Sequence, residues 1–327
     1  MPAAALFRRS RDRGHAFLQR HLGADGAFPA DAPSIAASYK ALTAFQVCGD
    51  DRAANRMCAW IRRHGILDSG DFAPRPQAAA AGDAYTYYNA WIIAGAHRLG
   101  QFDLSRRGLA FLRGFHDPVS GGFYSSVDRR DDDTEQDLMA TCMCGLAALY
   151  VGDLEIASGV GRWLQTVRDA QPDFPRLLYT VYSRAGGLVT TLPAGDGNRY
   201  LVERDADRDQ NIFNPGIAAA FLCRLYQSTG DESQLELARQ YLSVAEGASD
   251  FLFGIVRAGK VGWAASLLYR QTGDPRYREM AVRIGNNLAE LQFEAGFWSG
   301  VGGTEPSLDS TAERVVWMDE ILQVAED

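Results

Sequence analysis

The pattern of hydrophobic and polar positions predicts an all-α chain built from repeated helix pairs. Apolar, alanine-rich runs alternate with amphipathic runs rich in Arg and Glu, and a short turn of Gly and Asp recurs between them. Glycine just after a helix and aspartate near the start of the next are the usual signals of a helical hairpin. The turns are Gly49-Asp50, Gly100 with Asp103, Gly152-Asp153, Gly230-Asp231 and Gly273-Asp274.

Both signals together predict twelve helices in alternation. Amphipathic outer helices are expected near residues 8–21, 52–64, 103–115, 154–169, 232–247 and 275–292. More uniformly apolar inner helices are expected near 34–48, 84–99, 133–151, 210–228, 259–271 and 309–325. An open solenoid would need polar capping repeats, which neither end of the sequence offers. We therefore predict an (α/α)6 toroid of six outer–inner hairpins, formed by one domain over residues 1–327.

The composition is that of an ordinary globular protein, and the net charge limits the classes of molecule that the protein is expected to bind. The chain has 327 residues, of which 46% are hydrophobic, and a formal charge of −8. This acidic balance argues against nucleic acid or an anionic membrane as the main partner, so a small-molecule substrate is expected. Only Lys40 and Lys260 among the 33 basic residues are lysines, and both fall at N-terminal ends of predicted inner helices.

No segment of the sequence predicts a membrane span or a secretory leader. The apolar run at residues 3–7 is shorter than the core of a signal peptide, and no stretch approaches 18 consecutive apolar residues. The five cysteines form no CxxC pair, so buried reduced thiols are expected. These features predict a cytoplasmic protein without integral membrane insertion, and a homo-oligomer is left open.

A toroid of this kind has one default pocket. All inner helices run in the same direction, so their N-terminal ends surround one mouth, where helix dipoles favour anionic groups. Aromatic side chains at such a mouth stabilise carbocations and also stack on sugar rings. The residues expected to contact a substrate are Tyr39, Lys40, Tyr85, Tyr88, Trp91, Tyr124, Asp137, Phe213, Asn214, Lys260, Trp263, Trp298 and Glu313.

Carboxylates are densest at residues 131–137, of sequence DDDTEQD, where the third inner helix is expected to begin. Crowding should raise the pKa of at least one of these carboxyl groups, which keeps a protonated acid available near neutral pH. Asp83 paired with Asp132 or Asp133, from a neighbouring inner helix, would suit general acid and base roles across the mouth. The alternative is structural, because the same run contains a capping box.

Two stretches resemble terpenoid cyclases. The pattern Leu288-x3-Gln292-x3-Gly296-x-Trp298 matches the QW repeat of that family, in which the Gln caps a helix end and the Trp stacks over it. The run at 131–137 also resembles the DxDDT motif of class II cyclases. That resemblance implies that Asp132 takes the place of the aspartate that protonates an alkene or epoxide.

Other segments resemble further toroid families, each with one departure. Residues 137–146 resemble the inner helix of protein prenyltransferase β subunits, but Ala140 stands where that family has a zinc-binding His. Residues 117–124 and 272–277 look like turns of the N-acylglucosamine 2-epimerase type of barrel. Residues 214–217 look like that family's Pro-Gly-His segment, with Ile217 in place of its catalytic His. We therefore expect neither this zinc site nor a two-histidine proton transfer.

Three functions follow as hypotheses. The main prediction is an acid-initiated cyclase or isomerase of terpenoid type that acts on an apolar, isoprenoid-like substrate. The first alternative is a carbohydrate-active toroid enzyme, a hydrolase, lyase or isomerase, that uses paired carboxylates. The second alternative is a non-catalytic ligand-binding toroid. No cofactor and no metal site are predicted, with magnesium at residues 131–137 left open.

Overall fold

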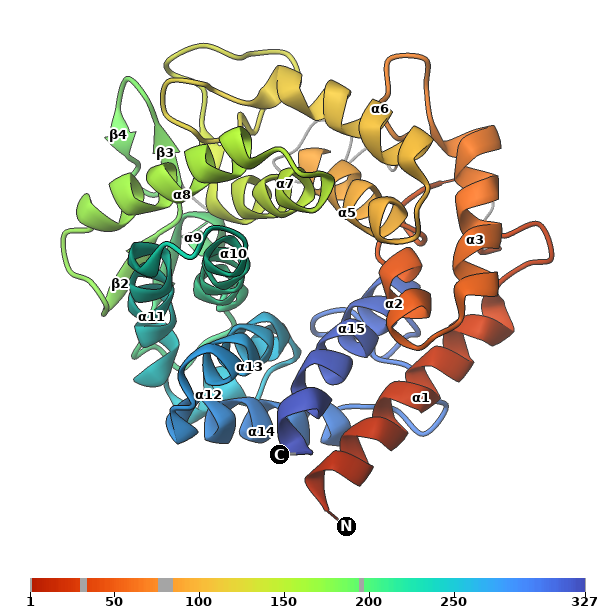
Figure 1. Ribbon diagram of the computed structural model, residues 1–327. Helices are drawn as coiled ribbons and strands as arrows, with labels where there is room; N and C mark the ends of the chain where they lie inside the picture. The colour runs from red at the N-terminus through yellow and green to blue at the C-terminus, as the bar shows by residue number, and fades with distance from the viewer. Residues whose placement is uncertain (1, 30–33, 76–84, 194–196, 327) are drawn as a thin grey trace.

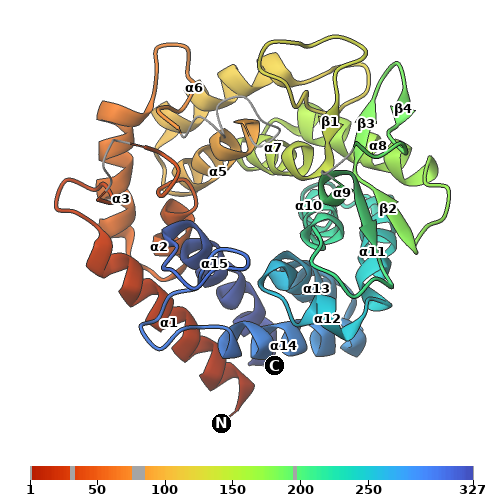
Figure 2. The same ribbon diagram turned by 180° about the vertical axis from the view of Figure 1, so that it is seen from behind.

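The computed structural model describes residues 2–29, 34–75, 85–193 and 197–326, which form a ring of helices in two layers (Figures 1 and 2). The outer layer contains α1 (Ala3–His21), α3 (Asp51–Trp60), α6 (Phe102–Leu112), α8 (Leu154–Asp169), α11 (Glu232–Glu246) and α14 (Pro275–Glu290). The inner layer contains α2 (Ala41–Val47), α5 (Tyr85–Arg98), α7 (Leu138–Val151), α10 (Phe213–Thr229), α13 (Gly259–Thr272) and α15 (Leu308–Ala325). The predicted (α/α)6 toroid is confirmed.

Shorter elements connect and extend these helices. They are a π-helical turn at Ile61–Gly65, 3-10 turns at Arg113–Phe115 and Val256–Ala258, α9 (Gly197–Tyr200) and α12 (Asp250–Phe253). Five short strands are also present among the described residues: β1 (Gln136–Asp137), β2 (Leu177–Tyr179), β3 (Val181–Ser183), β4 (Gly187–Leu188) and β5 (Leu201–Glu203). Within these residues, no helix is long and apolar enough to cross a membrane.

Two inner helices begin well after their predicted starts: α2 at Ala41, seven residues after the expected start, and α7, whose late start the strands explain. The strands form two small antiparallel sheets, one of order β1-β3-β4 and one of β2 with β5. Gln136 lies opposite Tyr182 in the first sheet. Because β1 uses the backbone of residues 136–137 for this pairing, α7 begins at Leu138, five residues later than the acidic run suggested.

The recurring Gly–Asp turns are helix boundaries, as the sequence indicated. The glycine of each turn has a left-handed backbone, with φ from +68° to +92°. These glycines are Gly49, Gly100, Gly152, Gly230 and Gly273. Four of the aspartates cap the next outer helix by accepting a backbone N–H; they are Asp50, Asp153, Asp231 and Asp274. At the remaining turn the capping position is Gln101, and Asp103 lies in the first helical turn.

A second set of left-handed glycines sets the distance between neighbouring outer helices. Gly26, Gly70, Gly121 and Gly296 lie in turns that follow outer helices, with φ from +86° to +95°. A Cβ there would lie within 2.6 Å of a carbonyl oxygen of the next outer helix, belonging to Arg56, Arg107, Gly159 and Arg13 respectively. Only glycine allows both this backbone conformation and this close approach.

The last of these contacts closes the ring, because Gly296 follows α14 and packs on α1. Two hydrogen-bonded contacts support the same closure. Ser10 donates to Gln292 Oε1 at 2.9 Å, and Arg11 forms an ion pair with Asp319 at 2.7 Å. The chain ends lie close together at this junction (Figure 1).

The residues of the QW-like segment are part of this closure. Gln292 Nε2 donates to the carbonyl oxygens of Ser10 and Gly296, both at 2.9 Å. Trp298 Nε1 donates to the carbonyl oxygen of Leu288 at 2.8 Å, near the end of α14. Both side chains therefore use their polar atoms to hold backbone in place.

Replacing Gly121 by Ala should destabilise the protein more than replacing Gly152 by Ala. Both residues have a left-handed backbone, which costs an alanine about 1–2 kcal/mol. Only at Gly121 does the added Cβ also collide with backbone, that of Gly159, and overpacking of this kind costs about 1–3 kcal/mol more. Urea unfolding of the two variants measures the difference, and equal losses would contradict a spacing role for Gly121.

Candidate functional site

A cavity of about 380 Å³ opens at the N-terminal ends of the inner helices. Each inner helix contributes at or near its start: Lys40 before α2, Tyr87 and Tyr88 of α5, Met139 of α7, Phe213 of α10, Lys260 of α13 and Glu313 of α15. The other lining residues are Tyr39, Val256, Arg257, Gly259, Gly300, Val301, Ser307, Asp309, Ser310, Arg314 and Trp317. The cavity therefore lies at the mouth that the toroid topology predicts.

A buried carboxylate organises the charges of this cavity. Glu313 Oε2 accepts from Lys40 Nζ at 2.9 Å and from Arg314 Nη1 at 3.0 Å. Glu313 Oε1 accepts from Lys260 Nζ. All four residues are at most 6% exposed, so the two lysines of the chain and one arginine meet on one carboxylate in the interior.

Mutual attraction keeps this cluster charged. Burial alone would raise the pKa of Glu313, but the surrounding Lys260, Lys40 and Arg314 hold it well below its usual range. Burial alone would lower the pKa of Lys40, but the carboxylates of Asp309 and Glu313 raise it instead. Glu313 is therefore an anion and Lys40 a cation throughout the neutral pH range.

Asp309 is the second carboxylate of the cavity. It precedes Glu313 by one helical turn on α15, so both face the same side. One Asp309 carboxylate oxygen lies 3.1 Å from Lys40 Nζ. Its side chain is 38% exposed, against 8% for that of Glu313, so Asp309 is the carboxylate that a ligand in the cavity can reach.

Positive charge is in excess in the cavity, although the chain as a whole has a net charge of −8. Lys40, Lys260 and Arg314 face two carboxylates, and the helix N-terminal ends add partial positive charge. Arg257 also lines the cavity and is paired 2.9 Å away with Asp209, which lies outside it. The site is suited to an anionic group.

Aromatic rings form the sides and the floor. Tyr39 and Tyr88 pack with ring centroids 4.2 Å apart, and Lys260 Nζ lies 4.8 Å from the ring centroid of Phe213. Trp317 closes the bottom, where it stacks on Trp263 at 4.6 Å. Trp91 lies 5.7 Å from Trp317 and lines a small hollow of about 30 Å³ beyond this layer.

The structure brings part of the predicted set into the cavity. The residues that line it are Tyr39, Lys40, Tyr88, Phe213, Lys260 and Glu313. The predicted contact residues that do not line it are Tyr85, Trp91, Tyr124, Asp137, Asn214, Trp263 and Trp298. Asp83 lies outside the described residues.

Other contacts explain why several of these side chains are elsewhere. The Tyr85 hydroxyl donates to Asp71, and Arg75 lies 3.8 Å above its ring, so Tyr85 belongs to a separate polar network. Asp137 caps α7 by accepting the Ala140 N–H at 3.1 Å. The buried indoles of Trp91 and Trp263 pack beneath the cavity floor.

The first three aspartates of the acidic run, residues 131–133, are exposed, and no residue of the run lines the cavity. The side chains of Asp132 and Asp133 are 60% and 70% exposed. Asp132 is paired with Arg184, and Asp133 lies 3.1 Å from Arg129. A hydrogen bond from Arg129 lowers the pKa of Asp131, so crowding does not raise it. This geometry pairs the carboxylates with arginines and gives Asp132 no enclosed acid site.

Sequence reasoning missed three lining residues that complete the site: Arg257, Asp309 and Trp317. The spacing of four between Asp309, Glu313 and Trp317 places them on one helical face, which is a signal that the sequence does contain. Arg257 lies in the 3-10 turn Val256–Ala258 before α13, which is too short for periodicity to indicate the direction of a side chain.

The described residues contain no group of three His, Cys, Asp or Glu side chains arranged to hold a metal ion. All five cysteines are among these residues, and none forms a disulfide. Cys142 and Cys144 are buried in α7, and burial raises the pKa of Cys144 to about 12. These thiols are core groups.

Comparison with known proteins gives structural neighbours only. No family model matches the chain, and no curated protein matches it. A D-mannose isomerase superposes with a TM-score of 0.72 at 12% identity, over 98% of this chain and 97% of the other. A glycoside hydrolase family 76 α-mannanase of Bacteroides thetaiotaomicron gives 0.68 at 14% identity, over 98% and 97%. An unsaturated glucuronyl hydrolase specific for heparin gives 0.65 at 13% identity, over 99% and 98%.

These neighbours place the chain among the α/α toroids and correct the main functional prediction. The terpenoid-cyclase hypothesis is wrong, because the similar structures are toroids that act on carbohydrates. Of the two stretches that supported it, the QW-like segment holds backbone in place and the DxDDT-like run has its proposed acid, Asp132, on the surface. Fold alone does not define a reaction, so the site has to supply the rest.

Replacing Glu313 by Gln should destabilise the protein and reduce its sensitivity to acid. Removing one partner of a buried ion pair costs about 3–5 kcal/mol. The lowered pKa of Glu313 stabilises the fold above the pKa of an unfolded glutamate, about 4.3, and this stabilisation is lost as the pH falls below it. Glu236→Gln, on the exposed face of α11, is the matched control.

Urea unfolding at several pH values from neutral to acidic measures both effects. We expect Glu236→Gln to follow the unmodified protein, and Glu313→Gln to be less stable near neutral pH with a shallower loss on acidification. If the free energy of unfolding changed with pH equally in all three proteins, Glu313 would not titrate as a buried anion.

Proposed function

We propose that the protein is a carbohydrate-active enzyme, a hydrolase whose sugar substrate carries a carboxylate and binds in the cavity at the inner-helix N-terminal ends. The observation that carries this proposal is the cluster of Lys40, Lys260 and Arg314, three buried cations inside an acidic chain. A uronic acid combines the two features that the lining residues suit, an anionic group and a ring with several hydroxyls.

The polar atoms of the cavity support such a ligand. The ammonium group of Lys260 has three donors, and its one hydrogen bond in the described structure goes to Glu313. Arg314 Nε is buried and has no hydrogen-bond partner among the described residues. A buried donor without a partner is costly, so an acceptor on a bound ligand would be favourable there. Tyrosines and the hydroxyls of Ser307 and Ser310 complete a lining suited to sugar hydroxyls.

The two carboxylates have different environments and therefore different proposed roles. Glu313 holds the cations in place, because it stays ionised between them. Asp309 is partly exposed and within reach of a ligand in the cavity, so we assign it acid–base chemistry at the glycosidic bond. Their nearest oxygens both lie within 3.1 Å of Lys40 Nζ, which keeps them within about 6 Å of each other, near the spacing that glycosidases use.

Hydrolysis fits the cavity better than proton transfer by histidine. All five histidines of the chain are described, and none lines the cavity. The neighbours include a mannanase and a glucuronyl hydrolase, and a Salegentibacter α-1,6-mannanase is inactive when two consecutive aspartates are replaced. A toroid of this shape therefore supports carboxylate chemistry on sugars. The cytoplasmic location and a homo-oligomeric state stay predictions from the sequence.

Binding measurements test the substrate class. Calorimetry with the methyl glycosides of glucuronic acid, glucose and mannose should show affinity for the acidic sugar at least about 10-fold higher than for the neutral ones. Lys260→Met should remove this preference. It deletes the ammonium group that bonds to one carboxylate, whereas the ammonium group of Lys40 bonds to two. Arg239→Met, on the outer surface of α11, is the control and should keep it. No binding of the acidic sugar would overturn the proposal.

Turnover of uronic acid glycosides tests the role of Asp309. Loss of an acid–base group lowers kcat by about 100-fold or more, so Asp309→Asn should lose turnover while still binding the sugar. Asp12→Asn on the outer helix α1 is the control for the same chemical change. Asp132→Asn and Asp133→Asn test the assignment made from the sequence. A loss in those variants with full activity in Asp309→Asn would locate the chemistry on the acidic run instead.

A further inference from the structure

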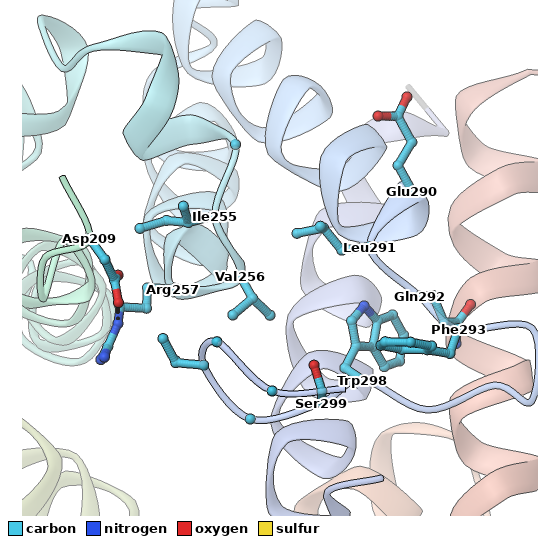
Figure 3. A pocket seen from close by; sticks show the side chains of 15 residues that line it. Asp209, Ile255, Val256, Arg257, Glu290, Leu291, Gln292, Phe293, Trp298 and Ser299 are labelled. Carbon is cyan, nitrogen blue, oxygen red and sulfur yellow. Dashed lines mark hydrogen bonds and ion pairs between the residues drawn. The ribbon is translucent and has the colours of Figure 1, made fainter. Parts of the chain in front are cut away.

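A second hollow lies beside the cavity and has a different chemical character. It is a groove of about 580 Å³ between the end of α14, the segment that precedes α13, and the loop that follows Trp298 (Figure 3). Ile255, Leu291, Phe293 and Val301 are among the residues that line it. The proposed function assigns it no role.

The groove adjoins the cavity. Val256, Arg257, Gly300 and Val301 line both hollows, so the two spaces meet at these residues. Arg257 is held at this junction by Asp209 and Asn211, each 2.9 Å away. Figure 3 shows Asp209 and Arg257 side by side at the edge of the groove. A ligand seated in the cavity could therefore extend into the groove without crossing the ring.

Apolar side chains dominate the groove. Leu291, Phe293 and Val301 are 39%, 36% and 46% exposed. They are three of nine large apolar side chains that are exposed in the described part of the chain, and all three line the groove. Exposed apolar surface gathered in this way marks a binding site more often than scattered residues do. The charge of Arg257 is already balanced by Asp209.

The groove is also preformed. Gln292 and Trp298 are fixed by the hydrogen bonds that close the ring, and Phe293 stacks on Phe297 with ring centroids 4.6 Å apart. The opposite edge is a loop rich in glycine. A Cβ built on Gly300 or Gly302 would meet no atom within 4 Å, so space remains there for a ligand.

We propose that this groove binds an apolar aglycone, an alkyl or aryl group attached to the anomeric oxygen of the acidic sugar in the cavity. The inference rests on the proposed function, which concerns the sugar, and adds the apolar group to which the sugar is linked. The charged cavity holds the sugar acid, and the groove buries the apolar group, which gains affinity in proportion to the area removed from water. The glycosidic bond then lies near Val256 and Val301, which line both spaces.

Calorimetry with the methyl, phenyl and octyl glycosides of glucuronic acid, in both anomeric forms, tests this inference. We expect the phenyl or octyl glycoside of one anomer to bind at least about 10-fold more tightly than its methyl glycoside. The double variant Leu291→Ser, Ile255→Ser should lose most of this gain while its affinity for the methyl glycoside stays within twofold. Both side chains are partly exposed, and thermal unfolding checks that the variant folds. Leu154→Ser, exposed on α8, is the matched control and should keep the gain.

The outcomes separate the two proposals. Equal affinities for methyl, phenyl and octyl glycosides, or a full gain in the double variant, overturn the groove inference and leave the proposed function standing. No affinity for any acidic glycoside overturns the proposed function itself. Light scattering tests whether a second copy of the chain occupies the groove instead. If the unmodified protein is a dimer, the double variant is a monomer and the glycoside affinities are unchanged, the groove is a dimer interface.

Discussion

The close approach of backbone to backbone between neighbouring outer helices is the constraint on which this ring depends. Glycines at 26, 70, 121 and 296 let four turns touch the next outer helix, and the last of them joins the end of the chain to α1. A toroid buries its inner helices only if it closes. Closure requires the distances between neighbouring outer helices to bring the last one against the first. These contacts therefore set four of the six steps between neighbouring outer helices, including the one that closes the ring.

The charge cluster is a direct consequence of that closure. Lys40 precedes α2, whereas Lys260 and Glu313 belong to α13 and α15, more than two hundred residues further along the chain. They meet only because the last inner helix packs beside the first. Helix N-terminal ends already favour anions, and the lysines strengthen this preference at the same point. Fold and electrostatics therefore act in the same direction in the cavity.

Much of the fold could be predicted from local signals, since Gly–Asp turns and 3.6-residue periodicity are properties of short segments. The two lysines were also informative, because both were expected at the mouth and both line the cavity. The role of the acidic run could not be judged in this way. Whether Asp132 faces a pocket or Arg184 depends on the strand pairing of β1 with β3, a contact between segments about fifty residues apart. Motif similarity carried no information about that pairing.

The tryptophan layer below the cavity has a consequence for how the site is used. Trp317 stacks on Trp263 with Trp91 beside it, so these three indoles lie between the cavity and the small hollow beyond it. Anything that enters by the mouth has to leave by the mouth or sideways along the groove. A polysaccharide could not thread through such a ring. For the hydrolase proposed above, cleavage would then take place at the terminal unit of a sugar chain, and the released sugar would leave by the way it entered.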